Sequence, residues 1–174
     1  VGAPTGRGGA AAVWTGSKMI IWSGFDNVSG FSDGAKYNPA SDTWNPISFV
    51  GAPSPSQDAF AAWTGSKMLV WSDHGGHAPA DGGLYDPVDD SWSLMSSPPA
   101  GFSQVGSSKV WAGSEMIVWG GSVGSVLVND GARYNAASDT WTLTSTAGAP
   151  SRRGGHSAIW TASEMIIWRG YDGL

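Results

Sequence analysis

Two imidazoles and a carboxylate lie within five residues at positions 73–77, in the order Asp-His-Gly-Gly-His. Imidazole nitrogens and carboxylate oxygens are common ligands of divalent metals, and the two glycines would let Asp73, His74 and His77 approach one ion. Neighbouring loop residues rarely hold a preorganised site, so a solvated polar loop is the favoured interpretation. The sequence therefore predicts no bound metal and no other cofactor.

Basic residues precede two apolar segments that end in Trp. They are Arg7 near the start of the chain, and Arg152, Arg153 and His156 near its end. A guanidinium group can bind a carboxylate through two parallel hydrogen bonds, so these side chains could hold an acidic ligand such as a sugar acid. The alternative, which we favour, is structural: such arginines bind backbone carbonyl groups and support the fold.

Aspartates recur at fixed places instead of forming one acidic cluster. One set lies two residues before a Trp and another directly before a Gly; the two sets are Asp42, Asp90 and Asp139, and Asp33, Asp81 and Asp130. Recurrence predicts turn residues that accept backbone N–H groups, not a general acid. No Ser–His–Asp set, paired carboxylates or phosphate-binding glycine loop is recognisable, so no catalytic residue and no enzymatic activity are predicted.

Composition limits the possible partners. The chain has 174 residues, with 9 basic against 14 acidic side chains and a net charge of −5. That balance leaves no excess of positive charge to neutralise phosphates, so nucleic acid is an unsuitable partner. No apolar run approaches the ~20 residues of a membrane-spanning helix. The absence of Cys excludes disulfides and thiolate chemistry.

The elements that must position these residues belong to an internal repeat. The segment from Trp14 to Trp22 returns three times, with its first Trp at positions 63, 111 and 160. A second block, from Tyr37 to Trp44, returns at 85–92 and 134–141. Each unit is predicted to contain four short strands joined by tight turns, because apolar segments of about four residues alternate with Gly, Pro, Asn and Asp. In the fourth copy Ala162 replaces the turn glycine, which predicts slight strain there.

Four-stranded antiparallel units of about 50 residues are typical of β-propeller blades. The pattern resembles the kelch repeat, in particular its bacterial Trp-rich form: Arg and His before the first strand, Gly-Gly after the second, and Tyr seven residues before Trp. Arg153 with His156, the pair Gly120-Gly121, and the Tyr and Trp of the second block carry this resemblance. It implies an all-β fold of kelch-type β-propeller blades, four-stranded and antiparallel.

About three and a half blades are expected in one array over residues 1–174. The expected blades cover approximately 10–49, 59–96 and 107–145, with a half-blade at 156–170. Copy two departs from the family pattern, with Ser56 in place of the Arg. A half-blade leaves an unpaired apolar edge, so we expect self-association, as a homo-oligomer, or completion by missing blades.

The connections between the second and third strands differ completely between copies, whereas the other turns repeat. If the first strand runs upward, these 2–3 loops share the lower face with the connectors between blades. Variation on a constant frame predicts a binding surface there, which would include Phe25 and Asp26 together with the residues named above. Unconstrained drift of the loops is the alternative.

Three functions remain open from the sequence. The leading hypothesis is a non-catalytic kelch-type module that binds a protein or glycan through this face. The second is a sugar-binding or mutarotase-like role, because the kelch family includes sialic acid mutarotase. Galactose oxidase, another kelch propeller, resembles this chain only in scaffold, because its copper chemistry needs a Tyr–Cys cross-link and this chain has no Cys. The third is a structural part of a longer propeller without independent activity.

Overall fold

The computed structural model describes residues 2–26, 28–56, 59–74, 80–99, 102 and 105–173. Its chain forms two compact units: residues 1–74 with 81–95, and residues 75–80 with 96–174. The described residues contain β-strands, turns and no α-helix, which confirms the predicted all-β class. None of them forms a helix long and apolar enough to cross a membrane.

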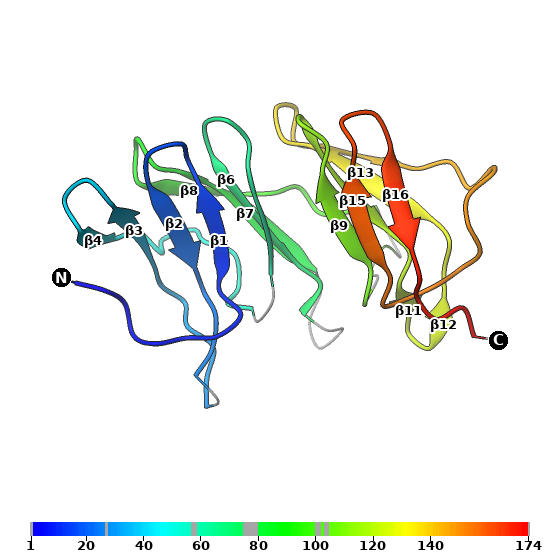
Figure 1. Cartoon of the computed structure of the whole chain (residues 1–174), viewed down its shortest axis with the longest axis horizontal. Helices are drawn as coiled ribbons and strands as arrows, with labels where there is room; N and C mark the ends of the chain where they lie inside the picture. Colours follow the sequence, from blue (N-terminus) through cyan, green and yellow to red (C-terminus); the bar gives the residue numbers. More distant parts are fainter. Residues whose placement is uncertain are drawn as a thin grey trace. The chain divides into compact units, whose positions relative to one another are not determined.

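The first unit contains two four-stranded antiparallel sheets, each with its strands in chain order (Figure 1). Blade 1 consists of β1 (Ala11–Trp14), β2 (Met19–Trp22), β3 (Gly34–Asn38) and β4 (Thr43–Pro46). Blade 2 consists of β5 (Phe60–Trp63), β6 (Met68–Ser72), β7 (Asp81–Asp86) and β8 (Ser91–Leu94). The prediction of four-stranded antiparallel blades is therefore confirmed.

The second unit contains one complete sheet and one pair of strands. Blade 3 consists of β9 (Ser108–Trp111), β10 (Glu115–Trp119), β13 (Gly131–Asn135) and β14 (Thr140–Leu143). The half-blade consists of β15 (Ser157–Trp160) and β16 (Met165–Trp168). A small hairpin, β11 (Ser122–Val123) with β12 (Val126–Leu127), lies between β10 and β13. The sequence reading missed it, although Val-Gly-Ser-Val is a hairpin signal.

Neighbouring sheets within each unit meet along their first strands, β1 against β5 and β9 against β15. In the first unit this places an apolar core between the blades, built from Ile20 and Trp22 of β2, Met68 and Val70 of β6, and Tyr85 of β7. The indoles of Trp22 and Trp92 lie 4.8 Å apart in this core. This contact joins Trp side chains of adjacent blades, with the two rings tilted by 57° and not stacked in parallel. The continuous apolar run of the second strand is explained by burial of both of its faces.

The turns between the first and second strands share one construction. The Thr at the start of three of them accepts backbone N–H groups through Oγ1: Thr15 from Lys18, Thr64 from Lys67, and Thr161 from Glu164. Ala162 has a φ of 80° at the position where the other copies have glycine. An L-residue is strained in this left-handed region, so the predicted strain of the fourth turn is confirmed.

Candidate functional site: the loop face

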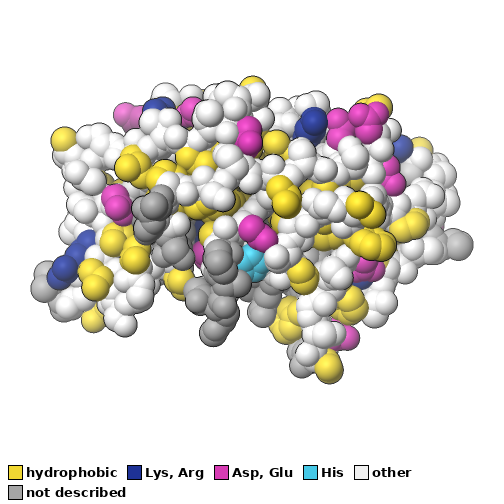
Figure 2. All heavy atoms as spheres, turned by 180° about the vertical axis from the view of Figure 1, so that it is seen from behind, with side chains coloured by type: hydrophobic (Ala, Val, Ile, Leu, Met, Phe, Trp, Pro, Cys, Tyr) yellow, Lys and Arg dark blue, Asp and Glu magenta, His cyan; other side chains and the backbone are white. Residues whose placement is uncertain are grey.

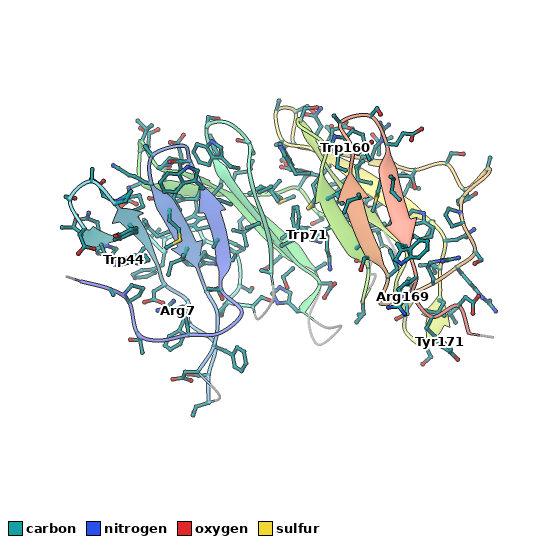
Figure 3. All side chains as sticks on the ribbon, viewed as in Figure 1. Arg7, Trp44, Trp71, Trp160, Arg169 and Tyr171 are labelled. Carbon is teal, nitrogen blue, oxygen red and sulfur yellow. The ribbon has the colours of Figure 1, made fainter. Side chains whose placement is uncertain are left out.

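Antiparallel strands place the 2–3 loops and the interblade connectors at one end of each sheet, which we call the loop face. In Figure 3, Arg7, Arg169 and Tyr171 lie at this end of their strands, while Trp160 lies at the opposite end of β15. The described side chains that the sequence nominated as ligand-binding belong to the loop face. The structure shows what each of the described ones contacts.

Arg7 is engaged inside blade 1. Its guanidinium donates to the carbonyl oxygens of Thr5 and Ser23, at 3.1 Å each, and to the carboxylate of Asp33 at 2.6 Å. It also lies 4.3 Å from the centre of the Phe31 ring, which is a cation–π distance. Only 4% of the side chain is exposed. This geometry agrees with the structural alternative: Arg7, in the segment before β1, binds the end of β2 at Ser23 and the start of β3 at Asp33.

Arg153 makes the equivalent contacts in the half-blade. Its guanidinium donates to the carbonyl oxygens of Ser151 and Arg169, at 3.0 and 2.9 Å, and to the hydroxyl of Ser151 at 2.7 Å. Arg169, which occupies the position of Ser23, has a φ of 62°. Two copies of the repeat thus use an arginine to bind the carbonyl group that follows the second strand.

In blade 2 a cluster of serines replaces this arginine. Ser56 occupies the arginine position, and its hydroxyl is hydrogen-bonded to Ser72 Oγ. Its N–H donates to Ser23 Oγ at 2.8 Å, and Ser23 Oγ donates to its carbonyl oxygen at 3.0 Å. All three serines are buried, and buried hydroxyls are stable only when paired. The cluster joins the loop-face ends of the two blades.

His156 is buried between glycines. Its ring packs edge-on against Trp119 with the ring centres 5.2 Å apart. A side chain at Gly120 or Gly170 would come closer than 3.0 Å to His156, so the glycines after β10 and β16 are what admit the imidazole. Burial, followed by the positive charge of Arg153, lowers the pKa of His156 below its usual value, and the Trp119 backbone offsets only part of this effect. His156 is therefore neutral at pH 7.

The 73–77 loop is only partly described. His74 Nε2 lies 2.7 Å from Asp81 Oδ1, and the His74 N–H donates to Ser72 Oγ at 3.0 Å. His77, the second imidazole of the hypothetical metal site, lies outside the described residues. Among the residues that are described, no group of three or more His, Asp or Glu side chains could hold a metal ion. Asp81 also accepts the N–H of Ser54 at 3.1 Å, so it binds an incoming connector, a role the turn interpretation did not foresee.

Phe25 and Asp26 begin the 2–3 loop of blade 1. Phe25 forms isolated β-bridges with Gly8 and Gly30. Asp26 Oδ1 accepts the N–H groups of Val28 and Ser29, both at 3.1 Å. These two backbone donors, that of Ser29 first, lower the pKa of Asp26. Asp26 is thus a loop-capping carboxylate, while Phe25 is a half-buried aromatic side chain on the loop face.

In the second unit the loop face contains a pocket of about 310 Å³. It is lined by Arg152 and by the residues that follow β16, with β12 on its other side: Ser125, Val126, Leu127, Tyr171, Asp172 and Gly173. Arg152 and Tyr171 are exposed, the latter by 66%. Among the described residues, Arg152 is the nominated basic side chain that lines this pocket. Sequence reasoning did not nominate Tyr171.

A signal for Tyr171 was present in the repeat. Phe25, His74, Ser122 and Tyr171 each lie eleven residues after the Trp that ends the first strand. Phe25, Ser122 and Tyr171 form the same kind of isolated bridge with the segment before the first strand. One position of the frame therefore carries four different side chains, which is a stronger indication of function than any single residue.

On the face that Figure 2 presents, Lys and Arg appear as separate spots without a continuous stripe.

One comparison with known proteins identifies the family. The family model described as the KLHDC2/KLHL20/DRC7 Kelch-repeats domain matches residues 2–170. The chain belongs to the kelch-repeat family. The resemblance inferred from the Arg, Gly-Gly and Tyr/Trp positions is thereby confirmed.

Among solved structures, one described as "Structure of YjhT" aligns with 90% of this kelch chain at a TM-score of 0.66 and 15% identity. That identity supports a shared fold and nothing finer. The kelch chain spans 57% of the length of that structure. No curated protein matches the chain.

Proposed function

We propose that this kelch domain is a non-catalytic binding module that takes a protein partner on its loop face. The observation that carries the proposal is the repeat position of Phe25, Ser122 and Tyr171, where the same backbone bridge presents three different side chains. His74, at the same position of blade 2, is mostly buried against Asp81. Kelch-repeat domains generally bind proteins, which supports the same function. Exposed aromatic and Arg side chains are also the residue types that contribute most to protein interfaces.

The pocket of the second unit is the proposed anchor site. Tyr171 offers an exposed ring, Arg152 a cation, and Val126 and Leu127 an apolar wall. This combination fits a peptide that carries an acidic side chain next to an apolar one. Arg7, Arg153 and His156 lie outside the proposed contact set, because Arg7 and Arg153 bind carbonyl groups within their own blades and His156 is buried against Trp119.

A peptide-display selection tests this proposal. Peptides selected on the unmodified domain are expected to bind at least tenfold more weakly to Tyr171→Ala and Arg152→Glu. Binding to Lys18→Glu, a substitution in the turn at the opposite end of blade 1, should stay unchanged. Peptides that bind all three variants equally would show that the loop face is not the binding surface.

An acidic glycan is the second candidate ligand, favoured by one observation. A volume of about 310 Å³ falls at the small end of ligand pockets, where a monosaccharide fits. Arg152 would bind the carboxylate and Tyr171 would pack on the sugar ring. A glycan array separates the two candidates: binding to acidic glycans that Arg152→Glu abolishes, without any selected peptide, would favour the sugar.

A further inference from the structure

The ends of blades 1 and 2 that lie opposite the loop face enclose a second pocket, within the first unit. The turns that join β1 to β2 and β5 to β6 lie at this end (Figure 1). Between the two blades is a groove of about 460 Å³, which we call the turn-face groove. Its volume falls within the range of small-molecule sites. Its walls include Lys18, Ile20 and Lys36 of blade 1 and Trp63, Pro87 and Val88 of blade 2.

The turn-face groove is positively charged in a chain whose net charge is −5. Two of the described residues that line it are lysines, and none is acidic. Lys18 is exposed, and its ammonium group makes no hydrogen bond or ion pair with a described residue. Lys67, at the same repeat position in blade 2, is ion-paired with Asp86 at 3.4 Å and does not line the groove. Lys18 therefore brings an unbalanced positive charge to this groove.

Lys36 is held in place by contacts across the blade boundary. Its Nζ donates to the carbonyl oxygen of Pro87 at 3.3 Å and lies 5.7 Å from the centre of the Tyr85 ring. These contacts join β3 of blade 1 to the turn between β7 and β8 of blade 2. An ammonium group has three N–H donors, so Lys36 retains donors for a ligand in the groove.

The charge balance around the groove favours a singly charged anion. Three effects lower the pKa of Asp90: first the hydrogen bond from Tyr85, then that from the Ser48 N–H, and after these the positive charge of Lys36. The charge of Lys36 is thus partly balanced by Asp90. Lys18 has no such counter-charge among the described residues, which leaves about one positive charge for a ligand.

The turns beside the groove favour a carboxylate over a phosphate. Phosphate sites commonly add backbone N–H donors from a helix start or a tight turn. Here the N–H groups of Ser17 and Lys18 already donate to Thr15 Oγ1, at 3.3 and 3.0 Å. The N–H of Ser66 likewise donates to Thr64 Oγ1 at 3.4 Å. The anion must therefore be bound by ammonium groups, and a carboxylate can accept from two of them.

Apolar side chains complete the walls of the groove. Trp63 is half-buried, Ile20 is fully buried, and Val88 is 88% exposed at the turn of blade 2. An indole pairs with another ring in an offset-stacked or edge-on arrangement. A ligand with an apolar ring would cover Trp63 and Val88 while its anionic group contacts the two lysines.

We infer that the turn-face groove binds a small carboxylic acid with an aromatic ring. The carboxylate is bound by Lys18 and Lys36, and the ring packs against Trp63. All of these residues belong to the first unit, whereas Arg152 and Tyr171 of the loop-face pocket belong to the second. The inference therefore does not depend on the proposed function.

The test uses the whole chain and 2-naphthoate as the probe. Titration calorimetry should show saturable one-to-one binding, and naphthalene-2-carboxamide, which has the same shape without the charge, should bind at least fivefold more weakly. Lys18→Met keeps the apolar stem of the side chain, so it should weaken the acid by about fivefold and leave the amide unchanged. Equal affinities of the acid and the amide would overturn the inference, as would the absence of saturable binding at millimolar concentration.

Two further variants locate the bound acid. Val88→Glu places a negative charge on the wall of the groove at an exposed position, so the protein should fold normally and bind 2-naphthoate about fivefold more weakly. Lys18→Glu should lose 2-naphthoate, whereas Arg152→Glu, the same change of charge at the loop-face pocket, should keep it. Loss of the acid in Arg152→Glu but not in Lys18→Glu would place the ligand on the loop face and overturn the inference without contradicting the proposed function.

Discussion

The carboxylate of Asp90 accepts the backbone N–H of Ser48 at 3.0 Å, across the boundary between blades 1 and 2. The indole of Trp92 binds the carbonyl oxygen of the same residue at 2.8 Å. Asp139 and Trp141 bind Ser96 in the same manner within the second unit. The Asp and Trp of the repeat thus hold one connector residue by its N–H and C=O groups, an arrangement that we call the clamp. The Asp also accepts a hydrogen bond from the hydroxyl of the preceding Tyr, as Asp139 does from Tyr134 at 2.7 Å.

Removing the clamp carboxylate should destabilise the first unit. Asp90→Ala leaves the Tyr85 hydroxyl and the Ser48 N–H without their acceptor and places Ala at a φ of 51°, so we expect a loss of about 2–3 kcal/mol. Urea unfolding measures the change. Asp89→Ala is the matched control and should stay within about 0.5 kcal/mol; an equal loss in both variants would refute the clamp.

The glycine that faces the second-strand Trp should tolerate no side chain. A Cβ on Gly34 would meet the carbonyl oxygen of Ile21, Ile47 and the ring of Trp22, so Gly34→Ala should cost about 3 kcal/mol. Gly6 has no atom within 4 Å of such a Cβ, and Gly6→Ala should change stability by less than about 0.5 kcal/mol. Thermal unfolding of both variants decides the question.

Two tryptophans at one repeat position should differ in their contribution to stability. Trp71 is 2% exposed, and its replacement by Ala should cost about 3–5 kcal/mol. Trp168 is 70% exposed, so Trp168→Ala should cost less than about 1 kcal/mol. Chemical unfolding of the two variants provides the comparison, and equal losses in both would contradict the dependence on burial.

Stability should decrease as the pH falls below about 6.5, with His156 as one cause. Burial, followed by the charge of Arg153, lowers the pKa of the folded imidazole below the 6.5 of an unperturbed histidine, so the unfolded chain binds the proton first. The free energy of unfolding contributed by His156 is complete above the unfolded pKa and declines below it. His156→Ala, which introduces the residue that copies one and two have there, should flatten this part of the pH profile. An unchanged slope between pH 7 and 5 would contradict the assignment.

The two kinds of arginine should separate stability from binding. Arg7→Ala removes three backbone or carboxylate contacts of a buried guanidinium and should lower stability by about 1–3 kcal/mol. Arg152→Ala, at an exposed pocket wall, should stay within about 0.5 kcal/mol while it weakens any loop-face ligand. Melting temperatures and binding measured on the same samples test this. If Arg7→Ala lost binding without losing stability, Arg7 would be a ligand-binding residue and its structural role would be contradicted.

Much of the fold follows from the chain itself, because each blade is built from local signals. Four short apolar segments separated by turn residues specify four strands, and their recurrence fixes the blade and the kelch family. Asp42, Asp90 and Asp139 were predicted to serve turns, and each has a φ near 51°. That Asp90 and Asp139 also bind the preceding Tyr and the connector was not predictable, since those partners meet only through strand pairing and blade packing.

Variation of the 2–3 loops between copies predicts that substitutions over 72–80 leave stability unchanged, and two described residues at the start of this range modify that expectation. Ser72 belongs to the buried serine cluster, and the side chain of His74 is 9% exposed against Asp81. Substitutions at these two positions are therefore expected to affect stability. Local composition predicts only that such residues form a loop, because burial depends on the segments that pack over it.

The sequence by itself determined the strands, the turns, the blade repeat and the set of loops that vary. Only the tertiary structure decided which nominated side chains are structural. Arg7 and Arg153 bind carbonyl groups, Arg7 also binds a carboxylate, and His156 packs on a Trp ring. Arg152, which the sequence did not distinguish from them, lines the pocket with Tyr171. The physical reason is that a guanidinium has the same chemistry everywhere. Its role depends on whether the backbone oxygens left unpaired at strand ends lie within hydrogen-bonding distance, and that distance is set by how the strands of a blade come together.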